Sequence, residues 1–246
     1  MIVDLSADVG EGADDLPLFP FLTSVSVACG AHAGDEATME RCVAEAKRLG
    51  VSVGAHPGFP DREGFGRRVI PMSDDDLART LRRQIGVLRT ICERGGVPLT
   101  QVKPHGALYN EAAVDHGLAV AVVEAVRTEG LIVVALAGSK LLAAAGEAGI
   151  DAAAEAFADR RYLADGTLAP RSLAGSLIED PAAAAEQAVA LATGGPIRTI
   201  DGDPLVIEGV RTVCLHSDTP GAPDTAGTVR DALERADVRV APLAGR

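Results

Sequence analysis

Four of the five histidines in this chain occupy the same kind of position, at or just past the end of a short apolar run. The segments SVSVACGAH, VSVGAH, LTQVKPH and TVCLH end at His32, His56, His105 and His216. An imidazole can exchange a proton near neutral pH and is a common ligand of metal ions. The pattern therefore predicts acid–base or metal-dependent chemistry at a site that these residues share. The fifth, His116, lies in the polar segment NEAAVDHGLAV and is expected on the surface of a helix.

Carboxylates and a lysine accompany these histidines. The first apolar run continues as DLSADVGE and places Asp8 and Glu11 just past its end. Lys103 precedes His105 by two residues, so both side chains point to the same side of an extended segment. Two cations so placed depress each other's pKa, which would suit acid–base work. The alternative is a lysine paired with a carboxylate, for which Asp8, Glu11 and Glu155 are the candidates.

A metal site would draw on the same residues. Asp8, His32 and His56 form a set that zinc or a similar divalent ion prefers. The HExxH spacing is absent, and metal-free acid–base chemistry is an equal alternative, so the presence of a metal stays open. The predicted catalytic residues are Asp8, Glu11, His32, His56, Lys103, His105, Glu155, His216 and Asp218.

Two polar segments supply arginines. GFPDREGFGRR follows His56 and contains Arg67, while EAFADRRYLADGTLAPRS contains Arg160 and Arg171. The second segment is too polar and proline-rich for a core element and predicts a long, functional loop. A guanidinium can hold a carboxylate or a phosphate in a bidentate fork. We therefore predict that Arg67, Arg160 and Arg171 bind substrate, with structural salt bridges as the alternative.

The elements that would position these residues alternate along the chain. Strand-like apolar runs lie at 2–7, 25–29, 51–55, 99–102, 131–136 and 212–215, with a weaker one at 238–241; helical stretches lie at 35–50, 72–96, 180–193 and 223–236. Apolar strands alternating with helices indicate a parallel sheet covered on both faces. About seven such units favour a single (β/α) barrel domain over residues 1–246, seven-stranded and irregular. In such barrels the active site lies at the C-terminal ends of the strands.

Composition and absent motifs narrow the function. The net charge of −12 argues against nucleic acid and anionic lipid as partners. Neither GxGxxG nor GxxxxGK[ST] occurs, which disfavours Rossmann and P-loop folds. The four cysteines are scattered, with neither a zinc knuckle nor a disulfide framework. No signal peptide or membrane span is recognisable, so a cytoplasmic protein is expected.

Six segments occur in an order that resembles one family: DLSADVGE, VACGAHAGD, VGAHPGFPDREGFGRR, VKPHGALYN, EAFADRRY with DGTLAPRS, and CLHSDTPGAP. They resemble the LamB/YcsF family. The resemblance implies a (β/α) barrel distantly related to polysaccharide deacetylases. It also implies one subunit of an ATP-dependent 5-oxoprolinase, which opens the lactam of 5-oxo-L-proline to L-glutamate. Companion subunits B and C are expected and would take part in handling ATP.

The sequence departs from the usual family pattern in four places. Ser6 stands where Asn is usual, Ala31 where an aromatic is usual, Ser217 where Gly is usual, and the loop after Gly12 is short. A different lactam or cyclic amide is therefore an open alternative. Two other functions compete: a stand-alone, metal-dependent hydrolase of deacetylase type that acts on an amide or N-acyl sugar, and a non-catalytic binding subunit.

Overall fold

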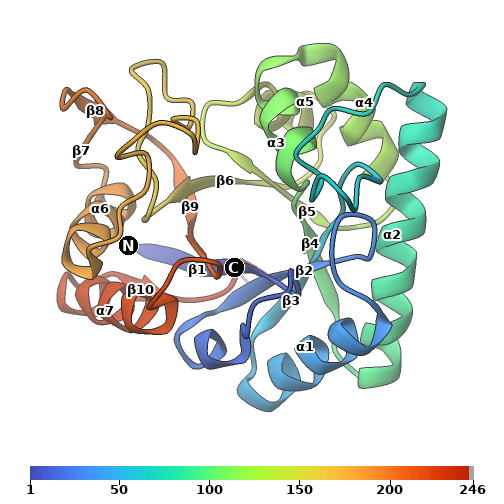
Figure 1. The fold of residues 1–246 in the computed structure, drawn as a ribbon, viewed down its shortest axis with the longest axis horizontal. Coiled ribbons are helices and arrows are strands. Elements are labelled where there is room, and N and C mark those ends of the chain that lie inside the picture. The colour runs from blue at the N-terminus through green and yellow to red at the C-terminus, as the bar shows by residue number, and fades with distance from the viewer. Residues whose placement is uncertain (244–246) are drawn as a thin grey trace.

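A computed structural model describes residues 1–243, so the last three residues of the predicted domain lie outside the described part. Seven parallel strands form a closed barrel (Figure 1), which confirms the predicted fold. They are β1 (Ile2–Val9), β2 (Ser24–Ala28), β3 (Ser52–His56), β4 (Leu99–Val102), β5 (Ile132–Leu136), β6 (Ala152–Phe157) and β9 (Val210–His216). The ring closes because β9 pairs with both β6 and β1. At the β1–β9 seam Asp8 lies opposite His216.

One strand of the barrel differs from the prediction. The run at 238–241 forms only β10 (Arg239–Val240), which pairs with the first residues of β1. The seventh barrel strand is instead β6, whose sequence AAAEAF contains four alanines. Alanine has low strand propensity, so this strand depends on pairing with β5 and β9 rather than on a local signal. β6 also carries Glu155 into the interior.

Four helices lie within two residues of their predicted bounds: α1 (Glu36–Leu49), α2 (Asp74–Gly95), α6 (Pro181–Thr193) and α7 (Ala222–Arg235). Their ends carry ordinary signals: the Asp35 and Ser73 side chains accept hydrogen bonds from first-turn backbone N–H groups of α1 and α2. The expected helix around His116 is α4 (His116–Val126), and His116 is exposed on it. Two further helices were not predicted: α3 (Gly106–Val114) and α5 (Lys140–Glu147). The alanine-rich sequence of α3 lacks a clear polar face, and α5 has only eight residues, which is short for a recognisable helical period.

The remaining elements are small. A 3-10 helix, η1 (Leu16–Phe21), follows β1, and an antiparallel hairpin of β7 (Pro196–Arg198) and β8 (Pro204–Val206) precedes β9. Figure 1 shows α6 and α7 on one side of the barrel and α1 and α2 on another. Within residues 1–243 we find no helix that is both long enough and apolar enough to cross a membrane.

Polar side chains fill the lower part of the barrel. The buried Asp4 carboxylate accepts hydrogen bonds from the hydroxyls of Thr23, Ser24 and Thr212, each at 2.7 Å. Ser6 Oγ lies 3.0 Å from Thr212 Oγ1 and belongs to this layer. Buried polar groups need such partners because leaving them unpaired is costly. Ser6, which stands where the family pattern usually has Asn, therefore lies one layer below the mouth of the barrel.

Candidate active site

The C-terminal ends of the strands bring the predicted residues to one cavity of about 450 Å³. Ten of them line it: Asp8, Glu11, His56, Arg67, Lys103, His105, Arg160, Arg171, His216 and Asp218. His32 and Glu155 lie just behind this lining, where they contact Glu11 and Lys103 respectively. Residues from several strand ends and from the loops that follow them thus converge, as the barrel fold requires.

Lys103 joins two carboxylates inside the barrel. Its Nζ lies 2.9 Å from Asp8 Oδ2 and 2.8 Å from Glu155 Oε1, with only 3% of the side chain exposed. Burial alone would lower the pKa of Lys103, but the charges of Asp8 and Glu155 raise it well above its usual value. Lys103 is therefore an ammonium, and the expected depression of its pKa by His105 is wrong. The alternative of carboxylate partners is confirmed.

Two residues that the sequence did not single out complete this network. The Tyr109 hydroxyl, from α3, donates to Glu155 Oε2 over 2.7 Å. Burial and the neighbouring Glu155 raise the pKa of Tyr109 well above its ordinary range, so the phenol keeps its proton. Cys214 Sγ lies 3.3 Å from Lys103 Nζ. Tyr109 could have been found from VKPHGALYN, because it follows His105 by four residues, one helical turn.

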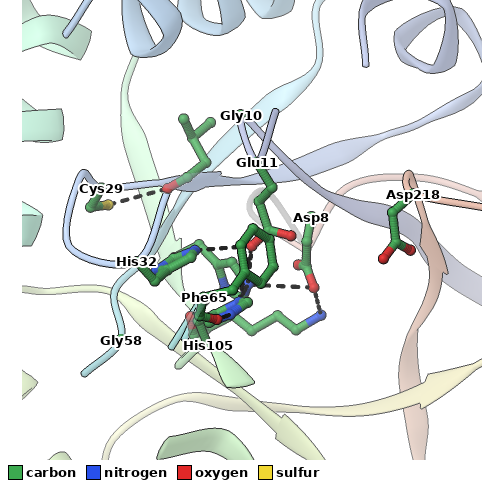
Figure 2. Close-up of polar contacts among 12 residues, drawn as sticks. Asp8, Gly10, Glu11, Cys29, His32, Gly58, Phe65, His105 and Asp218 are labelled. Carbon is green, nitrogen blue, oxygen red and sulfur yellow. Dashed lines mark hydrogen bonds and ion pairs between the residues drawn. The ribbon is translucent and has the colours of Figure 1, made fainter. Parts of the chain in front are cut away.

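Glu11 lies at the centre of a cluster of three histidines (Figure 2). Its Oε1 atom lies 3.0 Å from His32 Nε2, 3.0 Å from His105 Nδ1 and 3.5 Å from His56 Nε2. The rings of His32 and His105 stack in parallel with centroids 3.7 Å apart. One ligand atom from each of the four residues lies within 4.8 Å of all the others, a donor set that could hold a divalent metal.

This cluster differs from the metal set predicted from sequence. Asp8 Oδ2 lies 3.5 Å from His56 Nε2, but its closer partner is Lys103. Glu11 supplies the carboxylate instead, and His105 supplies a third imidazole. The reason is geometric: Glu11 lies past the end of β1, where the chain is free to turn over the barrel mouth, whereas Asp8 lies within the strand.

The electrostatics of the cluster favour neutral imidazoles beside an anion. Burial lowers the pKa of His56 to about 3 and also lowers the pKa of His32. Burial alone would raise the pKa of Glu11, but hydrogen bonds with His105 and His32 hold it well below its usual range. The site thus presents the Glu11 carboxylate beside the uncharged rings of His32 and His56 at neutral pH.

The loop that follows β3 covers the histidines. The backbone carbonyl of Phe65 lies 2.9 Å from His105 Nε2, and Phe65 has a positive φ of 55°. Gly66, at φ 64°, passes so close that a Cβ there would lie 2.7 Å from His105 Cδ2. Arg67 lies over the Phe65 ring at 4.9 Å and faces the cavity. Within this loop Gly66 therefore permits close packing on His105, whereas Arg67 faces the cavity.

A second group lies at the rim. His216 Nδ1 lies 2.9 Å from Asp159 Oδ1, and its backbone N–H donates to Asp159 Oδ2. Asp218 is exposed and stands apart from the histidine cluster in Figure 2. It pairs with Arg171 at 2.8 Å and lies 3.8 Å from Arg67. The rim therefore holds paired arginines beside a carboxylate.

Arg160 contributes from below the rim. Its Nη2 donates to the carbonyl of Ala169, while its buried Nε has no hydrogen-bond partner among residues 1–243. Ser217, one of the departures from the usual family pattern, also lines the cavity. The three arginines predicted to bind substrate thus lie around one opening, at different depths.

Comparison with known proteins agrees with this architecture. Residues 3–246 match the LamB/YcsF family. The chain is 45% identical to the A subunit of 5-oxoprolinase from Streptomyces coelicolor over 99% of this chain and 100% of that protein. It is also 45% identical to the corresponding protein of Chloroflexus aggregans, over 97% of both chains. The crystal structure of a lactam utilization protein from Thermus thermophilus superposes with a TM-score of 0.90 at 42% identity, covering 98% of this chain and 99% of that one. This chain therefore belongs to the LamB/YcsF family.

Proposed function

We propose that this chain is the A-type subunit of an ATP-dependent 5-oxoprolinase, which opens the lactam of 5-oxo-L-proline to L-glutamate. The observation that carries the proposal is near-complete alignment at 45% identity with proteins that bear the name of the A subunit of 5-oxoprolinase. The site supports it, because the cavity combines cationic groups at its rim with a buried lysine–carboxylate network.

The reaction sets clear demands on the site. A lactam is a stable amide whose carbonyl needs activation, for example by transfer of a phosphoryl group from ATP to its oxygen. Water then adds to the carbonyl carbon, the ring C–N bond breaks, and the nitrogen takes a proton. Hydrolysis of the activated acyl group releases L-glutamate, with ADP and phosphate as the other products. The protein must therefore orient water, stabilise negative charge on oxygen and deliver a proton to nitrogen.

We assign the first two tasks to Asp8 and Lys103. Asp8 is ionised, and its Oδ1 atom has no hydrogen-bond partner among the described residues, so it can accept one from the attacking water. Burial alone would raise the pKa of Asp8, but the neighbouring His56 and the Lys103 ammonium lower it. The Lys103 ammonium lies beside it and stabilises the charge that develops on the lactam oxygen.

We assign the third task, delivery of a proton to the leaving nitrogen, to His216. Asp159 holds its ring through Nδ1, which leaves Nε2 to exchange a proton with the leaving nitrogen. Arg67 and Arg171 at the rim, with Arg160 below them, would bind the substrate carboxylate or the phosphoryl group of the activated lactam. Asp218 holds Arg67 and Arg171 in place before substrate enters.

ATP would be handled by, or together with, the companion subunits B and C of a heteromeric cytoplasmic complex. The chain lacks the GxxxxGK[ST] motif that cradles phosphates in P-loop enzymes. The relatives are named as one subunit of 5-oxoprolinase, which supports an assembly with other subunits.

A coupled assay for glutamate and ADP tests the proposal. It compares this chain alone, the companion subunits alone, and all three together, with 5-oxoproline and ATP supplied. We expect product only from the complete mixture, its loss with Lys103→Ala, and unchanged activity with His116→Asn, an exposed histidine on α4. Complex formation without glutamate would contradict the assigned substrate.

The same assay addresses the second candidate, a stand-alone amide or N-acyl hydrolase. The cluster of Glu11 with three histidines is the observation that favours it, because such donor sets occur in metal-dependent hydrolases. Hydrolysis of other cyclic amides or N-acyl sugars by this chain alone, without ATP, would support that function and overturn the first.

A further inference from the structure

We infer that Glu11, His32, His56 and His105 form a binding site for one divalent first-row transition-metal ion of the zinc type. The inference concerns this chain by itself and does not depend on the identity of the substrate. It follows from how the imidazole nitrogens and the Glu11 carboxylate are placed and held.

Two of the rings have their tautomers set by backbone carbonyls. His56 Nδ1 lies 2.8 Å from the carbonyl oxygen of Lys103, and His105 Nε2 lies 2.9 Å from that of Phe65. A carbonyl can only accept, so each of these nitrogens carries a hydrogen. A ring that carries only this hydrogen has its lone pair on the other nitrogen, which is Nε2 of His56 and Nδ1 of His105. These two atoms lie 2.9 Å apart and belong to one group of possible metal ligands.

The Glu11 carboxylate faces the same point. Its Oε1 atom lies 3.0 Å from His105 Nδ1 and 3.5 Å from His56 Nε2. His32 Nε2 approaches that oxygen at 3.0 Å from the other side, and its buried Nδ1 has no partner within residues 1–243. Four atoms that can each bind a metal ion therefore converge on one small volume, where a single cation would contact all four residues.

The spacing suits a small ion. Zinc binds imidazole nitrogen and carboxylate oxygen at about 2.0–2.2 Å in a tetrahedral arrangement, which places ligand atoms roughly 3.3 Å from one another. The nitrogens of His32, His105 and His56 lie 3.0, 3.0 and 3.5 Å from Glu11 Oε1. His56 Nε2 and His105 Nδ1 lie 2.9 Å from each other. A donor set of three imidazoles and one carboxylate favours zinc or a similar transition metal over magnesium or calcium, which prefer oxygen.

The surroundings orient the ligands as metal sites require. Ligating histidines commonly donate their second ring N–H to a carbonyl or carboxylate, and the Lys103 and Phe65 carbonyls occupy that role. Phe65 reaches its position only with a left-handed backbone, at φ 55°, a strained conformation of the kind that clusters at functional sites. A bound ion of this type supplies polarisation of a carbonyl oxygen or a lowered pKa of a bound water.

The experiment uses the purified full chain stripped with a chelator and then titrated with Zn²⁺, Co²⁺ or Mg²⁺. We expect one Zn²⁺ per chain by calorimetry and elemental analysis, visible absorption bands with Co²⁺, a higher Tm with either ion, and no comparable response to Mg²⁺. Glu11→Gln and His56→Ala should each weaken Zn²⁺ binding at least tenfold. His116→Asn, which alters an exposed histidine, should bind like the wild type.

Glu11→Gln keeps the shape of the side chain, so it guards against a variant that simply fails to fold; the melting curve of the stripped protein checks this. A folded wild type that binds neither Zn²⁺ nor Co²⁺ would overturn the inference and leave a shared proton between His56 and His105 as the occupant. Equal binding by Glu11→Gln and His56→Ala would overturn it as well. Because the readouts are metal content, absorption and melting, failure here is separate from failure to form glutamate in the complete complex.

Discussion

Lys103 Nζ lies 2.9 Å from Asp8 Oδ2 in the interior of the barrel, and Glu155 Oε1 lies on its other side at 2.8 Å. Of the three side chains only that of Asp8, 14% exposed, has appreciable access to the cavity. The ammonium helps to offset the burial of Asp8, whose pKa is lowered, whereas burial still raises the pKa of Glu155. The charge that we assign to catalysis therefore also contributes to the stability of the fold.

Replacing Lys103 with methionine should therefore unfold the protein more easily as well as abolish glutamate formation. Removing one partner of a buried ion pair costs about 3–5 kcal/mol, since the remaining charge stays uncompensated. Urea unfolding measures the loss, with Lys140→Met, an exposed lysine on α5, as the matched control. A change below about 1 kcal/mol would mean that the carboxylates are not held by this lysine.

The Asp159–His216 pair predicts how stability depends on pH. Burial alone would raise the pKa of Asp159, but His216, and to a smaller extent Arg160, lower it below its ordinary 3.8. The folded state therefore prefers the carboxylate, and this stabilisation is complete above about pH 5 and is lost as the pH falls below 3.8 toward the folded pKa.

The variant Asp159→Asn tests this sign. The difference in free energy of unfolding between wild type and variant should be about 1–3 kcal/mol at neutral pH and should shrink steadily in acid. Denaturant titrations from neutral pH to about pH 3 measure it. A difference that does not change with pH would show that the carboxylate charge does not matter.

Removing an arginine from the rim should weaken substrate binding more than it slows the chemical step. Arg171→Ala should raise the KM for 5-oxoproline about tenfold with a smaller change in kcat, because it removes a charge-assisted contact worth about 1.4 kcal/mol. Steady-state kinetics of the complete complex measure the split. Arg235→Ala, on the exposed end of α7, should leave both constants unchanged. A fall in kcat alone would place Arg171 in the chemical step instead.

A larger residue in place of Gly66 should disturb the packing of the histidine cluster. An alanine there would have a left-handed backbone and a Cβ 2.7 Å from His105 Cδ2 and 2.9 Å from His32 Cβ. Gly66→Ala should therefore lower the Tm and weaken binding of Zn²⁺ to the stripped chain, both measurable by a thermal melt with added metal.

Gly86 provides the matched control for that substitution. It lies in α2, and a Cβ there would meet nothing within 4 Å, so Gly86→Ala should stabilise the chain slightly, by about 0.5–1 kcal/mol. If both alanine variants behaved alike, the loop after β3 would not constrain the histidines.

Much of the fold and the location of the site follow from sequence patterns alone. Alternating strands and capped helices predict a parallel barrel, and in such a barrel the C-terminal strand ends must meet at one face. The positions of His32, His56, His105 and His216 at strand ends therefore predict a common site from the sequence alone. The strand β6 was not predicted because alanine has little preference for strands. Its pairing with β5 and β9 is what makes this segment a strand.

The partners within the site were decided by tertiary structure. Asp8 and Lys103 are 95 positions apart, and no local pattern shows that Asp8 and Glu155, rather than Glu11, meet the lysine. No local pattern shows that Glu11 rather than Asp8 joins the histidine cluster. Nor does one show that the Phe65 carbonyl orients His105. Sequence periodicity reports which face of an element a residue occupies, whereas distances between side chains depend on how the closed barrel and its loops place separate elements in space.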